Sequence, residues 1–176
     1  MSEPNRSPPW RLFLALWPDE FTREAIAAWQ QSWRWPAGAK LVDRERLHLT
    51  MQFIGSVPAA RVPELASGLR VPFETAEILF EKGKVWPGGI AVLQPQSTPQ
   101  PLLRLHARLA RAVAALGLPV EERPLRAHVT LARKAPGATP PSAGASLRWR
   151  ADSGYVLVRS LPNGGGYEVL TRFSPP

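Results

Sequence analysis

One short pattern, which occurs twice in the chain, carries the residues best suited to chemistry. The first copy is Arg46-Leu47-His48-Leu49-Thr50-Met51, and the second is Arg126-Ala127-His128-Val129-Thr130-Leu131. Alternate side chains of an extended strand point to opposite faces. Each copy therefore predicts a strand with Arg, His and Thr on one face and apolar residues on the other. Such a strand would hold an imidazole and a hydroxyl over a cleft.

Chance explains this repetition poorly. The chain of 176 residues contains 3 His and seven Thr. Two His that are each followed by Thr two places later would arise at random with a probability of about 0.005. The alternative interpretation is two ordinary half-buried strands, because a single His on a strand is usually structural.

Two imidazoles that face each other across a cleft form a general acid–base pair. One imidazole takes a proton from the attacking group while the other protonates the leaving group, and the pKa of His suits both roles. Thr hydroxyls can donate hydrogen bonds to phosphoryl oxygens, and nearby Arg can offset negative charge on phosphorus. We see no Ser or Cys nucleophile motif, no carboxylate cluster and no Gly-rich phosphate loop. The pattern therefore predicts phosphodiester chemistry with an activated water or hydroxyl, without a metal ion or another cofactor.

Composition narrows the class of protein further. The length fits one domain, or two small lobes that share a core. The net charge of +8 and the pI of about 11 favour a polyanionic partner. The absence of Cys excludes disulfides, thiol nucleophiles and Cys-ligated zinc. Without a transmembrane-length apolar run or a signal-peptide core, we expect a soluble, cytoplasmic monomer that does not bind membranes.

The hydrophobic pattern predicts an α+β chain with mostly antiparallel sheets flanked by helices. Expected strands cover residues 11–17, 47–54, 72–86 (or a hairpin there), 90–93, from about 125, 148–160 and 167–173, the last two joined across a Gly-rich turn. Expected helices cover residues 18–33, 58–69 and 102–116. Residues 1–9 should form a flexible tail and residues 134–146 a flexible loop. Residues 10–176 should form a single two-lobed domain.

The spacing of these elements indicates an internal duplication. The first strand of each half begins 37 positions before its motif histidine in one case (Arg11 to His48) and 38 positions before it in the other (Ile90 to His128). Because a whole strand–helix–strand unit repeats, two similar units would each contribute one His strand to a shared site.

The two His-x-Thr pairs resemble the paired motifs of the two-histidine phosphoesterases. Within that superfamily the chain is most similar to the bacterial and archaeal RNA 2′,3′-cyclic phosphodiesterases, also called the 2′-5′ RNA ligase family. The resemblance covers most of the chain and rests on RLFLALWP, LHLTMQFIG, Leu105-His106, GLPVEERPLRAHVTLAR and YVLVRS before a Gly turn and Tyr167.

This resemblance implies two pseudo-symmetric lobes with a central cleft that carries one motif from each lobe. It implies metal-free hydrolysis of an RNA terminal 2′,3′-cyclic phosphate to a 2′-phosphomonoester. His48 matches the family's proton donor and His128 its proton acceptor. Thr50 and Thr130 match the phosphate-holding hydroxyls, and Arg133 matches a phosphate-binding Arg.

Several residues keep two interpretations. Strict alternation places Arg133 on the face opposite His128, so a bend would be needed for it to reach the phosphate. Phe53 could stack on a terminal base or pack in the core. Arg46 and Arg126 could contact phosphate or lie at the rim. His106 is expected to be a structural histidine.

Three functions are compatible with these residues. The first is the cyclic phosphodiesterase. The second is the reverse reaction, 2′-5′ ligation of RNA, in which the cyclic phosphate is the electrophile. The third is a catalytically silent RNA-binding module, which would not need a matched acid and base.

Overall fold

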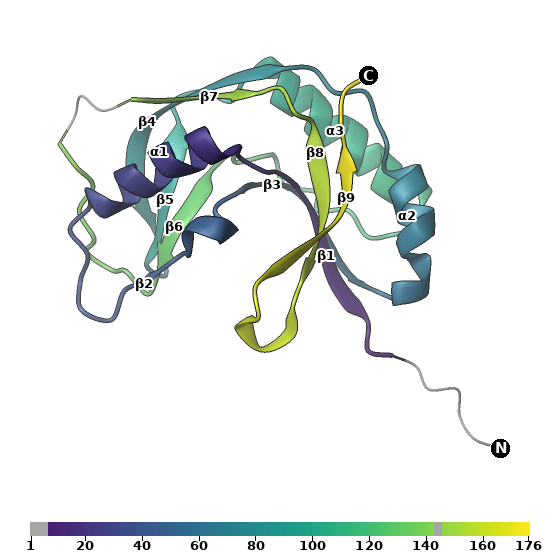
Figure 1. Cartoon of the computed structure of the whole chain (residues 1–176), viewed down its shortest axis with the longest axis horizontal. Coiled ribbons are helices and arrows are strands. Elements are labelled where there is room, and N and C mark those ends of the chain that lie inside the picture. Colours follow the sequence, from purple (N-terminus) through teal and green to yellow (C-terminus); the bar gives the residue numbers. More distant parts are fainter. Residues whose placement is uncertain (1–6, 143–145) are drawn as a thin grey trace.

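The chain forms two antiparallel sheets and three α-helices among the residues that the computed structural model describes, 7–142 and 146–176 (Figure 1). The strands are β1 (Trp10–Leu16), β2 (Lys40–Leu41), β3 (Leu49–Val57), β4 (Ala76–Trp86), β5 (Ile90–Pro95), β6 (Val129–Arg133), β7 (Leu147–Ala151), β8 (Tyr155–Ser160) and β9 (Tyr167–Phe173). The helices are α1 (Glu20–Gln31), α2 (Val62–Gly68) and α3 (Gln100–Ala115), with short 3-10 turns η1 (Arg44–Arg46), η2 (Ala59–Arg61) and η3 (Pro162–Gly164). The predicted α+β class and antiparallel pairing are confirmed.

The two sheets contain equivalent units. One sheet has the strand order β3-β1-β8-β9 and the other the order β2-β6-β5-β4-β7. In the first, β1 and β3 pair antiparallel and flank α1 in the sequence; in the second, β5 and β6 pair antiparallel and flank α3. The repeat that the spacing predicted thus corresponds to two strand–helix–strand units, one in each sheet.

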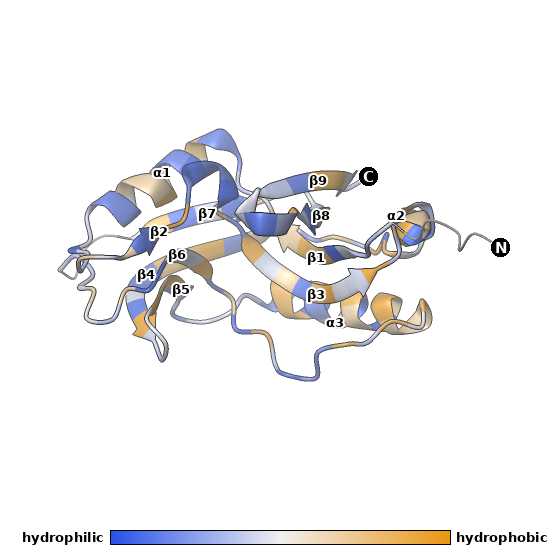
Figure 2. Ribbon diagram, turned by 90° about the horizontal axis from the view of Figure 1, so that it is seen from below, coloured by the Kyte–Doolittle hydropathy of each residue, from blue (hydrophilic) through white to orange (hydrophobic). Residues whose placement is uncertain are grey.

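The helix of each unit packs on the sheet of the other unit. The side chain of Gln30 on α1 donates to the carbonyl of Leu131 on β6 at 2.8 Å, and α1 also contacts β7. In turn, α3 packs against β3. Figure 2 shows α1 beside β2 and β7, and α3 on the other side of the molecule against β3. The exchange holds the two sheets together. No described helix is long and apolar enough to span a membrane.

Residues with suitable capping properties mark the start of α1 and the end of α3. The Asp19 carboxylate accepts a hydrogen bond from the backbone N–H of Thr22 at 2.7 Å, which satisfies one of the free donors at the start of α1. After α3, Gly117 adopts a φ of +71°, a conformation that glycine tolerates without steric cost.

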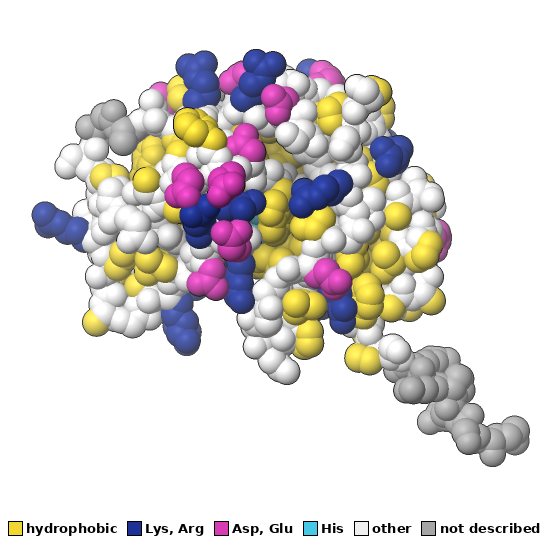
Figure 3. All heavy atoms as spheres, in the orientation of Figure 1, with side chains coloured by type: hydrophobic (Ala, Val, Ile, Leu, Met, Phe, Trp, Pro, Cys, Tyr) yellow, Lys and Arg dark blue, Asp and Glu magenta, His cyan; other side chains and the backbone are white. Residues whose placement is uncertain are grey.

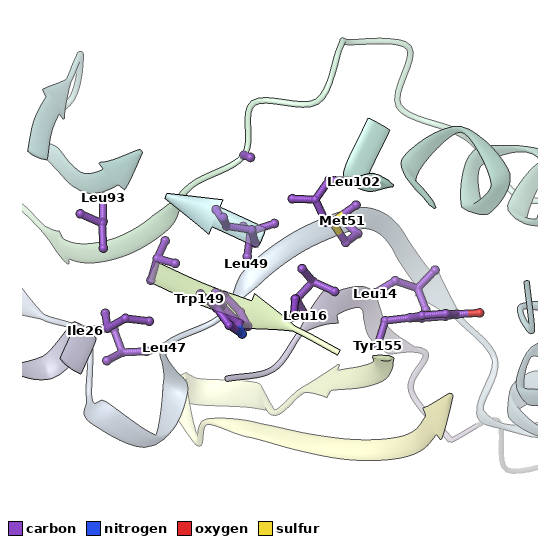
Figure 4. Close-up of a cluster of buried hydrophobic side chains, with 14 of the residues drawn as sticks. Leu14, Leu16, Ile26, Leu47, Leu49, Met51, Leu93, Leu102, Trp149 and Tyr155 are labelled. Atoms are coloured by element: carbon purple, nitrogen blue, oxygen red, sulfur yellow. The ribbon is translucent and has the colours of Figure 1, made fainter. Parts of the chain in front are cut away.

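One large hydrophobic core connects both sheets, and a second, smaller buried cluster lies within the first sheet. Figure 4 shows Leu16 and Leu49 of the first sheet near Trp149 of the second, and these side chains belong to one buried cluster with Leu14 of β1 and Leu93 of β5. The alternating apolar residues of the first motif, Leu47, Leu49 and Met51, all point into this core. The predicted hydrophobic back of the motif strand is therefore present.

Two predictions about the C-terminal half are wrong. The strand expected over 148–160 is two strands, because the chain turns at Gly154 and passes from β7 in one sheet to β8 in the other. Gly154 has a φ of +87°, and a Cβ there would lie 1.9 Å from the carbonyl oxygen of Phe173, so only glycine fits this crossing. The predicted hairpin of β8 and β9 is confirmed.

The segment expected to be a flexible loop over 134–146 is partly fixed. Ala135 and Ala138 are buried, and the backbones of Arg34 and Thr139 exchange two hydrogen bonds of 3.0 Å. The prolines and glycines therefore shape a packed connection up to residue 142, and residues 143–145 lie outside the described part of the chain. Most of the predicted tail, residues 1–6, also lies outside it.

We propose that residues 10–176 form one domain, because the core is shared. Leu14→Ala in one sheet and Leu93→Ala in the other should each lower the free energy of unfolding by about 2–5 kcal/mol. Far-UV circular dichroism and tryptophan fluorescence should give one coincident transition, which both substitutions shift as a whole. Leu103→Ala, at a half-exposed position of α3, is the control and should shift the transition much less. Two separate transitions would contradict a single domain.

Candidate active site

Backbone carbonyls orient both motif histidines in the same way. Nδ1–H of His48 donates to the carbonyl oxygen of Arg46 at 2.7 Å, and Nδ1–H of His128 donates to that of Arg126 at 2.6 Å. A carbonyl oxygen can only accept, so Nδ1 carries a proton in both rings whether or not the ring is charged. The other nitrogen, Nε2, is therefore the atom that gains or loses a proton in each ring.

Both rings line one cleft of about 560 Å³. The six residues selected from the sequence all line it: His48, Thr50, Phe53, His128, Thr130 and Arg133. One motif comes from the end of β3 and the other from the end of β6, so residues about 80 positions apart in the sequence converge. Each histidine lies one residue before its hydrogen-bonded strand begins, whereas the predicted strands, 47–54 and from about 125, included it.

Matched β-bulges turn one further residue of each motif toward the cleft. Met51 of β3 and Leu131 of β6 have no partner in the strand register, and each lies three positions after its histidine. A bulge adds one residue and reverses the alternation beyond it. Phe53 and Arg133, each five positions after its histidine, therefore reach the cleft face.

These bulges decide two of the open interpretations. The bend that Arg133 needs to reach the cleft is present. In addition to burial, the positive charge of Arg133 lowers the pKa of both imidazoles. The interpretation of Phe53 as a core residue is wrong, because 58% of its surface is exposed. Its position on the cleft wall is compatible with the other interpretation, a surface on which a base could stack.

Three aromatic rings enclose His48. Trp17 stacks on the imidazole at a centroid distance of 5.4 Å, and the rings of Phe13 and Tyr167 lie at 5.0 and 5.2 Å. Burial in this apolar surrounding lowers the pKa of His48 from 6.5 to about 4, although the carbonyl of Arg46 acts in the opposite direction. Nε2 of this neutral ring accepts a hydrogen bond from the hydroxyl of Thr50 at 3.1 Å.

His128 has a more open environment. One aromatic ring, Trp86, contacts it at a centroid distance of 4.4 Å, and the guanidinium of Arg126 covers Trp86 at 4.2 Å. Burial lowers the pKa of His128, and the positive charges of Arg126 and Arg133 lower it further. Both histidines are therefore neutral in the free protein at neutral pH.

The two motif arginines occupy different places relative to the cleft. A guanidinium N–H of Arg46 donates to the carbonyl of Gly164 at 2.9 Å, and Arg46 also pairs with Asp43. Arg46 lines the cleft, whereas Arg126 lines a neighbouring cavity of about 320 Å³ beside His128.

The third histidine does not line the cleft. His106 of α3 lies in the neighbouring cavity, where its Nε2 and the amide of Gln52 are 3.4 Å apart. Burial lowers its pKa. Its amide contact ties α3 to β3 next to the bulge. Within the described ranges, no group of three or more His, Asp or Glu side chains could hold a metal ion.

Several residues around the cleft were missed by the sequence analysis. Arg11, Phe13 and Trp17 share one face of β1 and its extension, and their alternation was a usable signal. Trp86 and Tyr167 had no such signal, because they reach the histidines from β4 and β9, which are far away in the sequence.

Comparisons with known proteins identify a matching family, similar sequences and similar folds. Residues 16–91 and 92–147 match the family model described as LigT like Phosphoesterase. An RNA 2′,3′-cyclic phosphodiesterase of Thermus thermophilus is 33% identical over 181 aligned residues, which cover 93% of this chain and 89% of the relative. A crystal structure of a phosphoesterase superposes with a TM-score of 0.82 at 27% identity, covering 95% of this chain and 98% of that one. E. coli LigT in complex with 3′-AMP gives a TM-score of 0.80 at 26% identity, covering 96% and 99%.

The enclosure of His48 makes a prediction about pH. In NMR titrations, its Nε2 should take up a proton with a midpoint near pH 4. Because the unfolded chain would bind that proton near pH 6.5, the contribution to stability is complete above pH 6.5. It should be lost as the pH falls toward 4, by about 3 kcal/mol. Trp17→Ala should open the ring to water and move the midpoint upward. A midpoint at or above 6.5 in the unaltered protein would contradict this account.

Proposed function

The chain belongs to the LigT-like phosphoesterases, and from this premise we propose that it hydrolyses the 2′,3′-cyclic phosphate at an RNA end to a 2′-phosphomonoester. The observation that carries the proposal is the pair of Nε2 atoms, both available for proton transfer, in one cleft. A Thermus relative is named RNA 2′,3′-cyclic phosphodiesterase, and a similar E. coli structure holds 3′-AMP.

In the proposed reaction, Nε2 of His128 takes a proton from a water molecule as its oxygen attacks phosphorus. The bond from phosphorus to the 3′ oxygen breaks, and Nε2–H of His48 protonates that oxygen, while the bond to the 2′ oxygen remains. The family resemblance gives this division of labour. The hydroxyls of Thr50 and Thr130 donate to the non-bridging oxygens, and Arg133 offsets their charge.

The proposed acid must be protonated, although the pKa of His48 in the free protein is about 4. An anion within a few Å of an imidazole favours the charged form and raises its pKa. The substrate phosphate would therefore raise the pKa of His48, so that Nε2 of this ring is protonated in the complex. In the free protein this form is a minority at neutral pH, so kcat/KM should be greatest on the acidic side of neutrality, and kcat at a higher pH.

We further propose that no metal ion takes part. The cleft residues themselves supply an acid, a base, two hydroxyl donors and a cation, and the described residues offer no cluster of metal ligands. The proposed partner is RNA that ends in a cyclic phosphate, and the proposed form of the protein is a monomer.

Hydrolysis of a nucleoside 2′,3′-cyclic phosphate in excess EDTA tests this function. The unaltered protein should release only the 2′-phosphate, with a bell-shaped dependence of rate on pH. His48→Ala and His128→Ala should each lose roughly 10²- to 10⁴-fold in rate. His48→Ala should lose the alkaline limb, and His128→Ala the acidic limb.

The control is His106→Gln, which removes the histidine outside the cleft and should cost no more than a few-fold. A substrate with a good leaving group should rescue His48→Ala far more than His128→Ala. Loss of activity in EDTA with recovery on adding a divalent ion would refute the metal-free mechanism. If neither motif variant lost more than a few-fold, or no hydrolysis occurred, a silent RNA-binding module would be the better conclusion.

A second candidate function is 2′-5′ ligation of RNA, and one cavity favours it. The cavity of about 320 Å³ beside His128 lies next to the group that would activate the nucleophile, and it shares Thr50, Phe53 and His128 with the cleft. It offers room for an attacking alcohol larger than water. There, a 5′-hydroxyl oxygen would form the bond to phosphorus and the 3′ oxygen would leave.

Supplying an RNA with a free 5′-hydroxyl, at high concentration beside a cyclic-phosphate RNA, tests this candidate. Ligation predicts a 2′-5′-linked product, whose yield falls in Leu125→Trp. This residue lines only the cavity, so hydrolysis of the cyclic phosphate should be retained. An unaltered yield in this variant, or hydrolysis as the sole outcome at every concentration, would count against ligation.

A further inference from the structure

A second cavity opens from the catalytic cleft on the His48 side. Its volume is about 400 Å³, and four residues line both spaces: Arg11, Arg46, Ser160 and Tyr167. The Tyr167 ring, which forms part of the shared wall, meets the imidazole of His48 at 5.2 Å. A ligand in the cleft can therefore continue past His48 into this second space, which we call the Arg11 cavity.

The Arg11 cavity has an excess of positive charge. Arg11, Arg46 and Arg159 line it, and none of its described lining residues is Asp or Glu. Arg46 and Arg159 have carboxylate partners, Asp43 and Glu168. Arg11 forms no ion pair and no side-chain hydrogen bond with any residue in the described ranges, and it projects at the boundary of the two spaces. Its guanidinium is thus free to bind an anion, and phosphate suits its planar donors.

Arginines on another face of the protein are less available. On the face shown in Figure 3, acidic and basic side chains lie intermingled left of centre, over α1 and η1. There Arg23 pairs with Glu45 at 2.9 Å and Arg44 with Glu20 at 3.1 Å. The positive charge that makes up the net charge of +8 is therefore unevenly distributed over the surface. The rim of the cleft beside β1 is one place where no carboxylate among the described lining residues compensates it.

The proposed chemistry gives the RNA strand a direction. If His48 protonates the 3′ oxygen, the C3′ side of the terminal ribose faces His48, and the nucleophile enters from His128. The strand leaves the terminal ribose through C4′ and C5′, next to C3′. The internucleotide phosphate therefore lies on the His48 side, where Arg11 and Arg46 are, and away from the cavity beside His128.

The Arg11 cavity also offers a surface for a nucleoside. The guanidinium of Arg159 lies over the indole of Trp10 at 3.7 Å, and Pro9 and Pro162 line the same space. Planar guanidinium groups and aromatic rings are the surfaces on which unpaired bases stack.

We propose that the Arg11 cavity binds the nucleotide upstream of the cyclic phosphate, with Arg11 on the phosphodiester that joins it to the terminal nucleotide. The protein would thereby prefer oligonucleotide ends to cyclic mononucleotides in kcat/KM, while it hydrolyses both. The inference rests on the proposed function and adds a second subsite to it.

Matched substrates test the inference. The kcat/KM of a dinucleotide that ends in a 2′,3′-cyclic phosphate should exceed that of the corresponding nucleoside 2′,3′-cyclic phosphate by roughly tenfold or more. Arg11→Gln should reduce this ratio by roughly five- to tenfold, since it removes one charged phosphate contact. Its salt dependence with the dinucleotide should also weaken, by about 0.7 in the log–log slope.

Two further variants separate the site from general effects. Arg111→Gln makes the same charge change on the exposed surface of α3, away from both spaces, and should leave the ratio unaltered. Asn163→Asp adds a negative charge inside the Arg11 cavity with almost no change of shape and should lower the ratio. Asn163 has a φ of +55°, which Asp also tolerates.

The outcomes distinguish this inference from the function on which it rests. Equal kcat/KM values for the two substrates would overturn the subsite while hydrolysis stands. So would a ratio of these values that Arg11→Gln and Asn163→Asp leave unaltered, as the control Arg111→Gln should. Failure to hydrolyse either substrate would overturn the proposed function first. Circular dichroism of each variant shows whether its fold is retained, and Asn163→Asp alone can refute the subsite if Arg11→Gln does not fold.

Discussion

Two hydrogen bonds from imidazole to backbone fix the orientation of both motif histidines. In each motif, the carbonyl two residues before the histidine accepts Nδ1–H, which fixes the ring, its tautomer and the nitrogen that can exchange protons. Because the acceptor is a backbone carbonyl, no second side chain is needed to orient the ring, and the end of a strand can hold an imidazole in place by itself. This arrangement does require that the backbone at Arg46 and Arg126 be held firmly, and the remaining structure supplies that support.

The support comes from the exchange of helices between the two units. Gln30 of α1 donates to the carbonyl of Leu131, the bulged residue of β6, which also accepts the backbone N–H of Val42 at 2.8 Å. On the other side, Gln52 follows the bulge of β3 and its amide meets His106 of α3. Each bulge is thus fixed by a helix of the opposite unit. The same contacts hold the sheets together and turn Phe53 and Arg133 toward the cleft.

Equal motifs lie in unequal surroundings, and this asymmetry matters for chemistry. Three aromatic rings close around His48, whereas one ring, covered by the guanidinium of Arg126, contacts His128. The flanking spaces differ as well: the described lining of the space on the His48 side has arginines and no carboxylate, whereas Arg123 and Arg126 share the cavity beside His128 with Glu121 and His106. Symmetric strands alone cannot distinguish an acid from a base. Side chains from β1, β4 and β9 make that distinction possible, because burial and charge act on the pKa of each ring separately.

The sequence by itself determined the paired motifs, their apolar backs, the repeated strand–helix–strand unit and the antiparallel α+β class, since alternation and helical periodicity are local properties of the chain. It also selected six residues that line one cleft. Only the tertiary structure decided the faces of Phe53 and Arg133, because a bulge depends on the partner strand and leaves no simple local pattern. It likewise decided the turn at Gly154 between sheets and the aromatic enclosure of His48. These features arise from contacts between segments far apart in the chain, which local periodicity does not encode.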